Sequence, residues 1–254
     1  MKFVIPSFGR ISELKEKSLK FLKKYDIDLK DIYIFVREDD NQLWLYESLE
    51  DINIVICNVK GIGRTHNFIT EYFEEGEIII ELDDDLVKMV DRNKEEITDL
   101  KGEINKMIKL MEEQNISYGG IYQVDNSMFM KTQDNYTYDL RYCLGIFRIR
   151  KICKDIKLET NYSEDFENCI LHYIRDGKII KNNHLCAITK NYAKGGCNAD
   201  GRNNESEKID KEFLSNKYPQ FCKLFQRKSG IWDLRLKAYK QKSTNKMGSV
   251  AMKV

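Results

Sequence analysis

The chain has 254 residues, with 42 Lys and Arg against 41 Asp and Glu, and hydrophobic residues make up 42% of it. This length suits one large domain or two small ones, and mixed charges together with 11% aromatic residues exclude a disordered or collagen-like chain. No apolar run reaches the roughly 18 residues of a membrane span, and the first residues lack the apolar core of a signal peptide. We therefore expect an intracellular, cytoplasmic protein that has no membrane partner.

The first half of the chain alternates apolar runs with amphipathic ones. Runs typical of strands cover Lys2–Pro6, Asp31–Arg37, Ile52–Asn58 and Glu77–Leu82, and helical spacing covers Ser12–Tyr25, Asn41–Leu49 and His66–Phe73. Strands that alternate with helices in this way predict a mainly parallel sheet with helices on both faces.

The pattern changes after Asp85. Helices are predicted at Lys94–Asn115 and Ser163–Arg175, strands at Gly119–Val124, Ser127–Lys131, Arg141–Ile149 and Lys178–Thr189, and a Gly/Asn-rich loop at Gly195–Asn204. These segments predict a mixed or antiparallel extension of the sheet. No repeat or linker divides the chain, so we expect a single domain over residues 1–235 and a C-terminal tail over residues 236–254.

The C-terminal part of the chain is basic. From Lys223 to the C-terminus there are nine Lys and Arg residues and one acid, Asp233, so the rest of the chain is net acidic. Lys and Arg gain affinity for polyanions by releasing phosphate counterions, which favours a nucleic-acid partner. A tail that only improves solubility explains the composition equally well.

The seven cysteines are an odd number and contain no Cys-x-x-Cys pair. This usage predicts reduced, buried thiols with no disulfide and no cysteine-ligated zinc site.

Three consecutive carboxylates, Asp83, Asp84 and Asp85, directly follow an apolar run that reads Ile78-Ile79-Ile80-Glu81-Leu82. Like charges this close repel one another and raise each other's pKa, a cost that a divalent cation relieves. Asp83 and Asp85 can point the same way from an extended segment, and hard carboxylate oxygens suit Mg²⁺ or Mn²⁺. The end of a parallel strand is also where open α/β sheets bind ligands. A solvated turn is the alternative.

An ordered series of motifs carries a family resemblance. A first strand ending in Ile-Pro-Ser with Arg10 after it, a second ending in Phe-Val-Arg-Glu, the run Gly-Ile-Gly-Arg-Thr-His-Asn at residues 61–67 and the three aspartates resemble a nucleotide-sugar glycosyltransferase of the A-type fold. Within that superfamily the chain most resembles the phage and viral TET-associated glycosyltransferases, which are thought to add sugars to hydroxymethylated pyrimidines in DNA. The resemblance covers residues 1–90 well and residues 140–205 more weakly.

The resemblance implies a Rossmann-like mixed sheet flanked by helices, a nucleotide-sugar donor that is preferably UDP-linked, and Mn²⁺ or Mg²⁺. Residues expected at the donor are Pro6, Ser7, Arg10, Glu38, Arg64, Asn67, Asp83, Asp84, Lys194, Gly195 and Gly196. Glu38 can accept from a uracil or ribose group, Arg64 and Asn67 lie at a helix start suited to phosphate, and the glycine loop lets backbone approach phosphate. Metal contacts are expected from Asp83, Asp85 and, as a third ligand, His184.

Asn161-Tyr162-Ser163-Glu164-Asp165 opens a predicted helix. Inverting members of the fold often carry an acid at such a helix start, so the resemblance implies Asp165 as the general base and Glu164 as the second candidate. In a retaining enzyme these acids only position the sugars, and acids also favour a first helical turn for electrostatic reasons alone.

The expected activity is therefore that of a metal-dependent hexosyltransferase, and the preferred acceptor is 5-hydroxymethylcytosine or another hydroxymethylated pyrimidine in DNA. Two alternatives remain at this stage. One is transfer of the same donor to a glycan or a protein, and the other is a non-catalytic module that binds a nucleotide-sugar or a carbohydrate.

Overall fold

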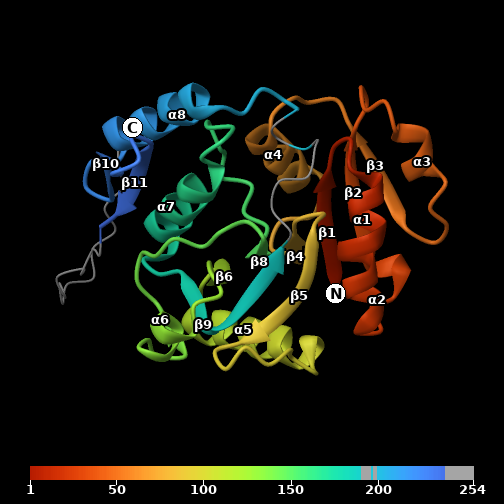
Figure 1. Ribbon diagram of the computed structural model, residues 1–254, viewed down its shortest axis with the longest axis horizontal. Helices are drawn as coiled ribbons and strands as arrows, with labels where there is room; N and C mark the ends of the chain where they lie inside the picture. Colours follow the sequence, from red (N-terminus) through yellow and green to blue (C-terminus); the bar gives the residue numbers. More distant parts are fainter. Residues whose placement is uncertain (190–195, 197–198, 238–254) are drawn as a thin grey trace.

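The computed structural model describes residues 1–189, 196 and 199–237. Runs of apolar, β-branched and aromatic residues form the strands of a central mixed sheet (Figure 1). The strands of this sheet are β1 (Lys2–Ser7), β2 (Ile32–Arg37), β3 (Asn53–Cys57), β4 (Ile78–Leu82), β5 (Leu86–Asp91), β6 (Tyr118–Tyr122), β7 (Tyr136–Thr137), β8 (Phe147–Lys151) and β9 (Ile180–Thr189). Their order is β3-β2-β1-β4-β8-β6-β9-β5, with β7 paired to β9.

Helical segments cover this sheet, and a small hairpin follows it. The helical segments are α1 (Ile11–Leu14), a π-helical turn η1 (Lys15–Leu19), α2 (Lys20–Lys24), a 3-10 turn η2 (Leu29–Asp31), α3 (Leu43–Glu47), α4 (Ile62–Tyr72), α5 (Leu100–Gln114), α6 (Ser127–Lys131), α7 (Glu164–Asp176) and α8 (Asn204–Lys217), and the hairpin consists of β10 (Cys222–Gln226) and β11 (Trp232–Leu236). None of the described helices is both long and apolar enough to cross a membrane.

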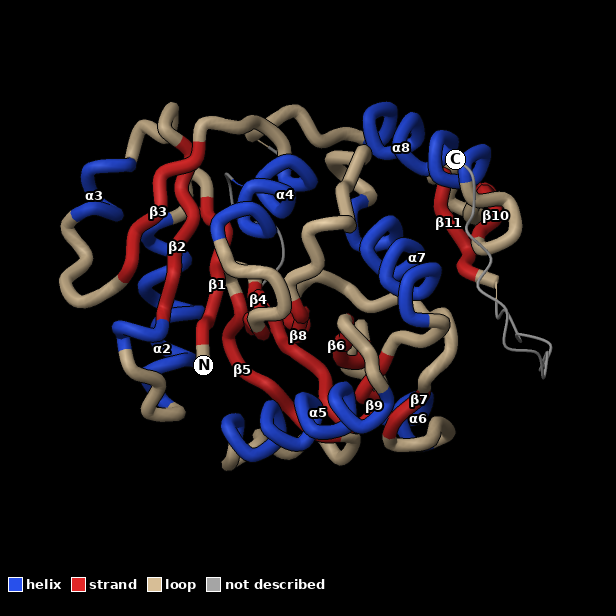
Figure 2. Tube along the Cα trace, turned by 180° about the vertical axis from the view of Figure 1, so that it is seen from behind, coloured by secondary structure: helices blue, strands red, loops and turns tan. Residues whose placement is uncertain are grey.

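The alternation of side chains along β1 divides the core into two layers. Phe3 and Ile5 pack in one cluster with Leu14 of α1 and Leu22 of α2, whereas Val4 packs in another with Ile69 of α4. The helices therefore cover opposite faces of the sheet, as the views from the front and from behind show (Figures 1 and 2). This arrangement confirms the predicted layering.

The strand order creates a topological switch between β1 and β4. Strands β1 to β4 are parallel to their neighbours within this set, and the chain runs outward from β1 to β2 and β3 before it returns to β4 on the other side of β1. Ligands bind outside the carboxyl ends of strands at such a point. Strand β8 then pairs antiparallel with both β4 and β6, which gives the predicted mixed extension.

The structure corrects several sequence-based expectations in the second half. Residues 127–131 form helix α6, not a strand, because the side chain of Asn126 caps Phe129. The helix predicted from Lys94 begins at Leu100, since residues before Asp99 pair with β5: the backbone N–H of Ile97 donates to the carbonyl of Met89. Strands β5 and β7, helix α8 and the hairpin were not predicted.

Helix α8 and the hairpin form one packed unit near the C-terminus. Ile170 of α7, Leu214 of α8, Cys222 of β10 and Leu234 of β11 share one buried cluster. Strand β11 ends at Leu236, one residue beyond the expected domain boundary, and most of the basic tail lies outside the described residues.

Candidate active site

The carboxyl ends of β1 and β4 meet at the topological switch. The Ser7 hydroxyl at the end of β1 donates to Asp84 over 2.7 Å. The Arg10 guanidinium bridges two of the aspartates, with Nη1 2.8 Å from Asp84 and Nη2 2.8 Å from Asp85. Ser7 and Arg10, which are both expected at the donor, thus contact the aspartate run directly.

A serine on the π-helical turn holds the aspartate turn in place. Ser18 is buried; its hydroxyl donates to the Asp83 carbonyl over 2.6 Å and accepts from the Leu86 backbone N–H over 2.9 Å. The Asp83 N–H also donates to the Ile146 carbonyl over 3.1 Å, so both ends of the turn are bonded. π-Helical turns are frequent at functional sites, and this one places Ser18 under the turn.

Burial disfavours the ionised form of two of the aspartates, Asp83 and Asp84. Burial, together with the negative charges of Asp85, Asp165 and Asp84, raises the pKa of Asp83 to about 7. Burial raises the pKa of Asp84 to about 6, although Arg10 and the Ser7 hydroxyl act in the opposite direction. Groups whose pKa is perturbed in a cleft mark a functional site.

These residues fit a divalent cation that shares its coordination with a substrate. Among the described residues, no group of three His, Cys, Asp or Glu side chains is arranged to hold a metal ion by itself. Mg²⁺-type sites usually use one or two carboxylates and complete their coordination with water and substrate phosphate. Asp83 and Asp85, both partly accessible and lining the cavity, provide that number of carboxylates.

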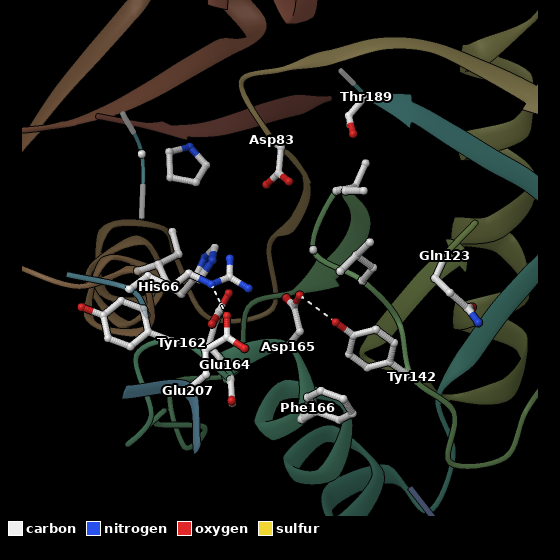
Figure 3. A pocket seen from close by; sticks show the side chains of 18 of the residues that line it. His66, Asp83, Gln123, Tyr142, Tyr162, Glu164, Asp165, Phe166, Thr189 and Glu207 are labelled. Carbon is white, nitrogen blue, oxygen red and sulfur yellow. Dashed lines mark hydrogen bonds and ion pairs between the residues drawn. The ribbon is translucent and has the colours of Figure 1, made fainter. Parts of the chain in front are cut away.

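Asp165, in the first turn of α7, faces the same cavity as Asp83 (Figure 3). Arg148 Nη1 donates to its Oδ1 over 3.1 Å, and the Tyr142 hydroxyl approaches its Oδ2 at 3.4 Å. A Cβ atom on Gly145 would lie 2.6 Å from Oδ1, so only glycine allows this approach. The carboxylate is thus oriented through both oxygens.

Arg148 belongs to a buried charge cluster that joins β8, β4 and α4. Its side chain is 1% exposed; Nε donates to Glu81 over 2.5 Å and Nη2 lies 2.7 Å from Nε2 of His66. Burial would raise the pKa of Glu81, but the guanidinium groups of Arg148 and Arg150 outweigh it and hold that pKa well below its usual range. Burial beside Arg148 lowers the pKa of His66 to about 4, so the imidazole is neutral near pH 7.

Glu164 directly precedes Asp165 in the first turn of α7. Burial and the adjacent charge of Asp165 raise the pKa of Glu164 well above its usual range. A raised pKa favours the protonated carboxyl, which cannot accept a proton from a hydroxyl group. The raised pKa thus counts against Glu164 as the general base.

The segment that leads into α7 is fastened to α4 and α8. A Cβ atom on Gly63 would lie 1.8 Å from the Thr160 carbonyl oxygen, so the start of α4 packs backbone against backbone. The Asn67 amide bonds both polar groups of the Leu158 backbone, at 2.8 and 2.9 Å. Asp210 of α8 accepts from the N–H groups of residues 161 and 162. The glycine motif at residues 61–67 therefore positions the start of α7.

The structure brings most of the expected site residues to one cavity of ≈1100 Å³. The expected residues that line it are Pro6, Ser7, Arg10, Asp83, Asp84, Asp85, Glu164, Asp165 and Gly196. The N–H of Gly196 donates to the Phe8 carbonyl over 2.9 Å, close to Arg10. Lys194 and Gly195 lie outside the described residues.

Four expected residues do not line the cavity. Glu38 and Arg64 are exposed to solvent, and Asn67 is occupied by Leu158 as described above. His184 lies on β9, where its N–H donates to the Asn182 side chain, and the structure does not bring it together with Asp83 and Asp85. These four side chains form no part of the site proposed below.

The sequence pattern does not single out four further residues of the site: Ser18, Arg37, Tyr142 and Arg148. Arg37 donates to Asp39 over 2.7 Å, pairs with Asp200, and its guanidinium lies 4.0 Å from the centre of the Phe8 ring. The available signal was the unusual presence of Arg148 and Arg150 within an apolar strand, where unpaired charges are not tolerated.

No protein-family model matches the chain, and no curated protein matches it either. Solved structures do match its fold. Residues 1–349 of TarS from S. aureus, in complex with UDP, align with a TM-score of 0.51 and 17% identity over 86% of this chain and 72% of that one. Glucosyl-3-phosphoglycerate synthase from Mycobacterium tuberculosis, in complex with Mn²⁺, UDP and phosphoglyceric acid, aligns with a TM-score of 0.56 and 10% identity over 94% of this chain and 87% of that one. The chain thus has the expected A-type glycosyltransferase fold.

Proposed function

We propose that the protein transfers a hexosyl group from a nucleotide-sugar, preferably a UDP-sugar, to a hydroxyl acceptor with the help of Mn²⁺ or Mg²⁺. The observation that carries this proposal is the meeting of Asp83, Asp85, Arg10 and Asp165 in one cavity at the switch point of the sheet. The solved structures that share the fold support it, since UDP is bound in both and Mn²⁺ in one.

Asp83 and Asp85 would hold the cation, which when bound neutralises the diphosphate of the donor as a Lewis acid. Arg10 lies against Asp84 and Asp85 at the same edge, where its guanidinium can bind a phosphate oxygen of the donor. Pro6 and Ser7 at the end of β1 and the backbone of Gly196 complete this donor side.

Asp165 would act as the general base of an inverting transfer. It takes the proton of the acceptor hydroxyl while the oxygen bonds to the anomeric carbon. The bond from that carbon to the donor phosphate oxygen breaks, and the nucleoside diphosphate leaves with the electron pair. Arg148 and Tyr142 fix the two oxygens of Asp165 before the acceptor arrives, and this preorganisation lowers the cost of reaching the transition state.

The preferred acceptor is a 5-hydroxymethylated pyrimidine in DNA, and the cytoplasm of a host cell is the expected compartment. The support is the resemblance of residues 1–90 to the TET-associated group, together with two basic residues of the C-terminal segment, Arg227 and Arg235, that line the cavity. A base must leave the duplex to reach a cavity, at a cost of a few kcal/mol, unless the DNA is single-stranded.

The test is incubation with a pool of tritiated UDP-sugars and Mn²⁺ and with single-stranded DNA that contains hydroxymethylcytosine, hydroxymethyluracil or neither. We expect label in the hydroxymethylated DNA only. Asp85→Ala should abolish transfer, and Asp165→Asn should lower kcat at least about 100-fold with little change in the donor KM. Transfer that persists in both variants contradicts the assigned site, whereas label in an added glycan or protein but not in DNA contradicts only the acceptor.

A further inference from the structure

Formal charge is divided unevenly along the cavity. The donor end is acidic: the four carboxylates Asp83, Asp84, Asp85 and Asp200 line it, against the two guanidinium groups of Arg10 and Arg37. This excess of negative charge is what a divalent cation would neutralise. Asp165 and Glu164 lie beyond it, at the start of α7.

The opposite end of the cavity is basic. Six cations line it, Arg141, Lys181, Arg202, Lys211, Arg227 and Arg235, against the three carboxylates Asp139, Glu207 and Asp233. Figure 1 shows β1 to β3 and the β10–β11 hairpin on opposite sides of the molecule, with α7 between them. The base candidate therefore lies between an acidic donor end and a second end with a net positive charge, which we call the basic end.

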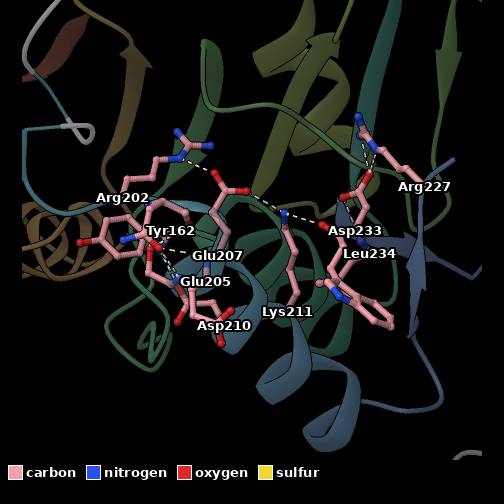
Figure 4. Close-up of polar contacts among 12 residues, drawn as sticks. Tyr162, Arg202, Glu205, Glu207, Asp210, Lys211, Arg227, Asp233 and Leu234 are labelled. Carbon is pink, nitrogen blue, oxygen red and sulfur yellow. Dashed lines mark hydrogen bonds and ion pairs between the residues drawn. The ribbon is translucent and has the colours of Figure 1, made fainter. Parts of the chain in front are cut away.

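One wall of the basic end is a row of charges on α8, the hairpin and the residues just before α8 (Figure 4). Arg202 and Lys211 both contact Glu207, at 2.6 and 2.8 Å, so two cations share a single carboxylate. Lys211 is buried, and its ammonium also donates to the Trp232 carbonyl over 3.1 Å. Arg227 pairs with Asp233 further along the row.

Lys181 of β9 is a second buried ammonium in this end. Its side chain bonds the Gln123 amide oxygen and, over 2.7 Å, the Tyr142 carbonyl, and it lies 5.0 Å from the centre of the Tyr122 ring. No carboxylate lies within ion-pair distance of it in the described part of the chain, although it is only 3% exposed. An ammonium carries three donors, so one remains for a ligand.

Arg235 of β11 is a second cation with no carboxylate partner among the described residues. Its guanidinium lies 4.9 Å from the centre of the Phe225 ring, and the side chain is exposed at the rim of the cavity. The lack of a counter-charge is costly for the buried Lys181, and an anionic ligand would remove that cost when it binds. Arg235 is exposed, so it adds positive charge at the rim without that cost. Because the proposed donor site takes the acidic end, the basic end is the one left for the acceptor.

We propose that the basic end binds a phosphate group carried by the acceptor, through Lys181, Lys211 and Arg235. This inference rests on the proposed function, which it deepens by stating what the acceptor must carry besides its hydroxyl. The phosphate is either that of a hydroxymethylated nucleotide or that of a phosphorylated polyol, and the chemistry that recognises it is the same.

The first experiment measures binding without turnover. Inorganic phosphate and glycerol 3-phosphate are titrated by calorimetry into protein saturated with UDP and Mn²⁺, so that the donor end is filled. We expect Arg235→Gln to raise the dissociation constant of both probes about fivefold or more, the effect of losing a charge-assisted contact at a partly exposed site. Lys181→Gln should do the same.

Lys223→Gln is the matched control. Lys223 lies directly opposite Arg235 in the hairpin and carries the same charge, but it does not line the cavity. Equal effects of the Arg235 and Lys223 substitutions would reduce the interaction to general charge attraction and overturn the proposal. Absence of phosphate binding in the wild type would overturn it as well. If UDP itself does not bind, the proposed function fails, and the same titrations without UDP still decide this inference.

The second experiment identifies the source of the phosphate. Transfer to 5-hydroxymethyldeoxyuridine is compared with transfer to its 5′-monophosphate, its 3′-monophosphate and a trinucleotide, and transfer to glycerol with transfer to glycerol 3-phosphate. We expect a lower KM for the phosphorylated member in one of these series, and this advantage should shrink in Arg235→Gln but not in Lys223→Gln. Equal use of the acceptors with and without phosphate in both series would contradict the proposal.

Discussion

At the residue scale, the site depends on a few side chains whose partners come from distant parts of the chain. The aspartates could be predicted, because three carboxylates after an apolar strand form a local pattern. Arg148 could not, because its partners Glu81, His66 and Asp165 lie 67, 82 and 17 residues away in sequence. Asp165 was predicted from resemblance, but the reason for its orientation became visible only in the fold.

Arg148 is expected to act as a positioning residue for Asp165. Arg148→Lys should lower kcat about 10- to 100-fold, because an ammonium cannot hold three partners in the plane of a guanidinium, and a small displacement of a catalytic group has an effect of this size. The donor KM should change little. Steady-state kinetics with the donor and acceptor varied separately measures both quantities.

Arg150→Lys supplies the control for this prediction. Arg150 also bonds Glu81, over 2.5 Å, and its other contact is the Thr70 hydroxyl, so the substitution perturbs the same buried cluster without touching Asp165. Both variants should be destabilised. An equal loss of kcat in the two variants would show that Arg148 acts only through the stability of the cluster.

At the scale of elements, the site depends on helical segments that hold two stretches of chain in place, the aspartate turn and residues 158–162. Ser18 on the π-helical turn holds the aspartate turn, and α4 and α8 hold residues 158–162 ahead of α7. The strands β1 to β4 were predicted because their apolar runs are short and continuous. Helix α8 was missed because its sequence is mostly polar: among its residues only Lys211 and Leu214 are buried, and a capping box at Asn203 begins it.

Ser18→Ala is expected to raise the Mn²⁺ concentration needed for half-maximal activity more than it changes donor binding. The substitution removes two buried hydrogen bonds to the aspartate turn and should destabilise the fold by about 1–3 kcal/mol. A looser turn holds Asp83 and Asp85 less well, so half-maximal activity should require several times more Mn²⁺. Titration of activity with Mn²⁺ and urea unfolding measure the two effects.

Ser12→Ala in α1, the segment before η1, is the matched substitution, since Ser12 is exposed and caps no helix. It should leave both the Mn²⁺ requirement and the stability unchanged. If Ser18→Ala loses stability but keeps the wild-type Mn²⁺ requirement, Ser18 supports the fold and not the aspartate turn.

At the scale of the whole molecule, two buried histidines link the free energy of unfolding to pH. Burial lowers the pKa of His172 well below its usual value, and lowers that of His66 to about 4. His172 lies away from the cavity, where its Nδ1 is 2.7 Å from the Ser117 hydroxyl and its ring stacks on Tyr118. Below about pH 6.5 these two histidines therefore bind protons in the unfolded chain but not in the folded chain, until the pH falls much further.

This difference predicts a loss of stability in acid. The contribution of His172 is complete above pH 6.5 and is lost as the pH falls below that value, at up to about 1.4 kcal/mol per pH unit. His172→Gln should flatten the decline in the free energy of unfolding between pH 6.5 and pH 4, because glutamine does not titrate. The buried carboxyl groups titrate in both proteins and cancel in the comparison. Urea unfolding at a series of pH values gives the slopes, and identical slopes would refute the prediction.

The pairing of β8 with β4 has a consequence for how the chain reaches this structure. In the native register Arg148 lies opposite Glu81, while Ile149 lies opposite Ile80 and faces the apolar cluster on the other side of the sheet. A slip of one residue would send both arginines of β8 into that cluster and leave Glu81 buried without a partner, at a cost of roughly 3–5 kcal/mol. The ion pairs that orient the base thus also favour the native strand register. A chain in which β8 is misaligned would lose native stability and the orientation of Asp165 together.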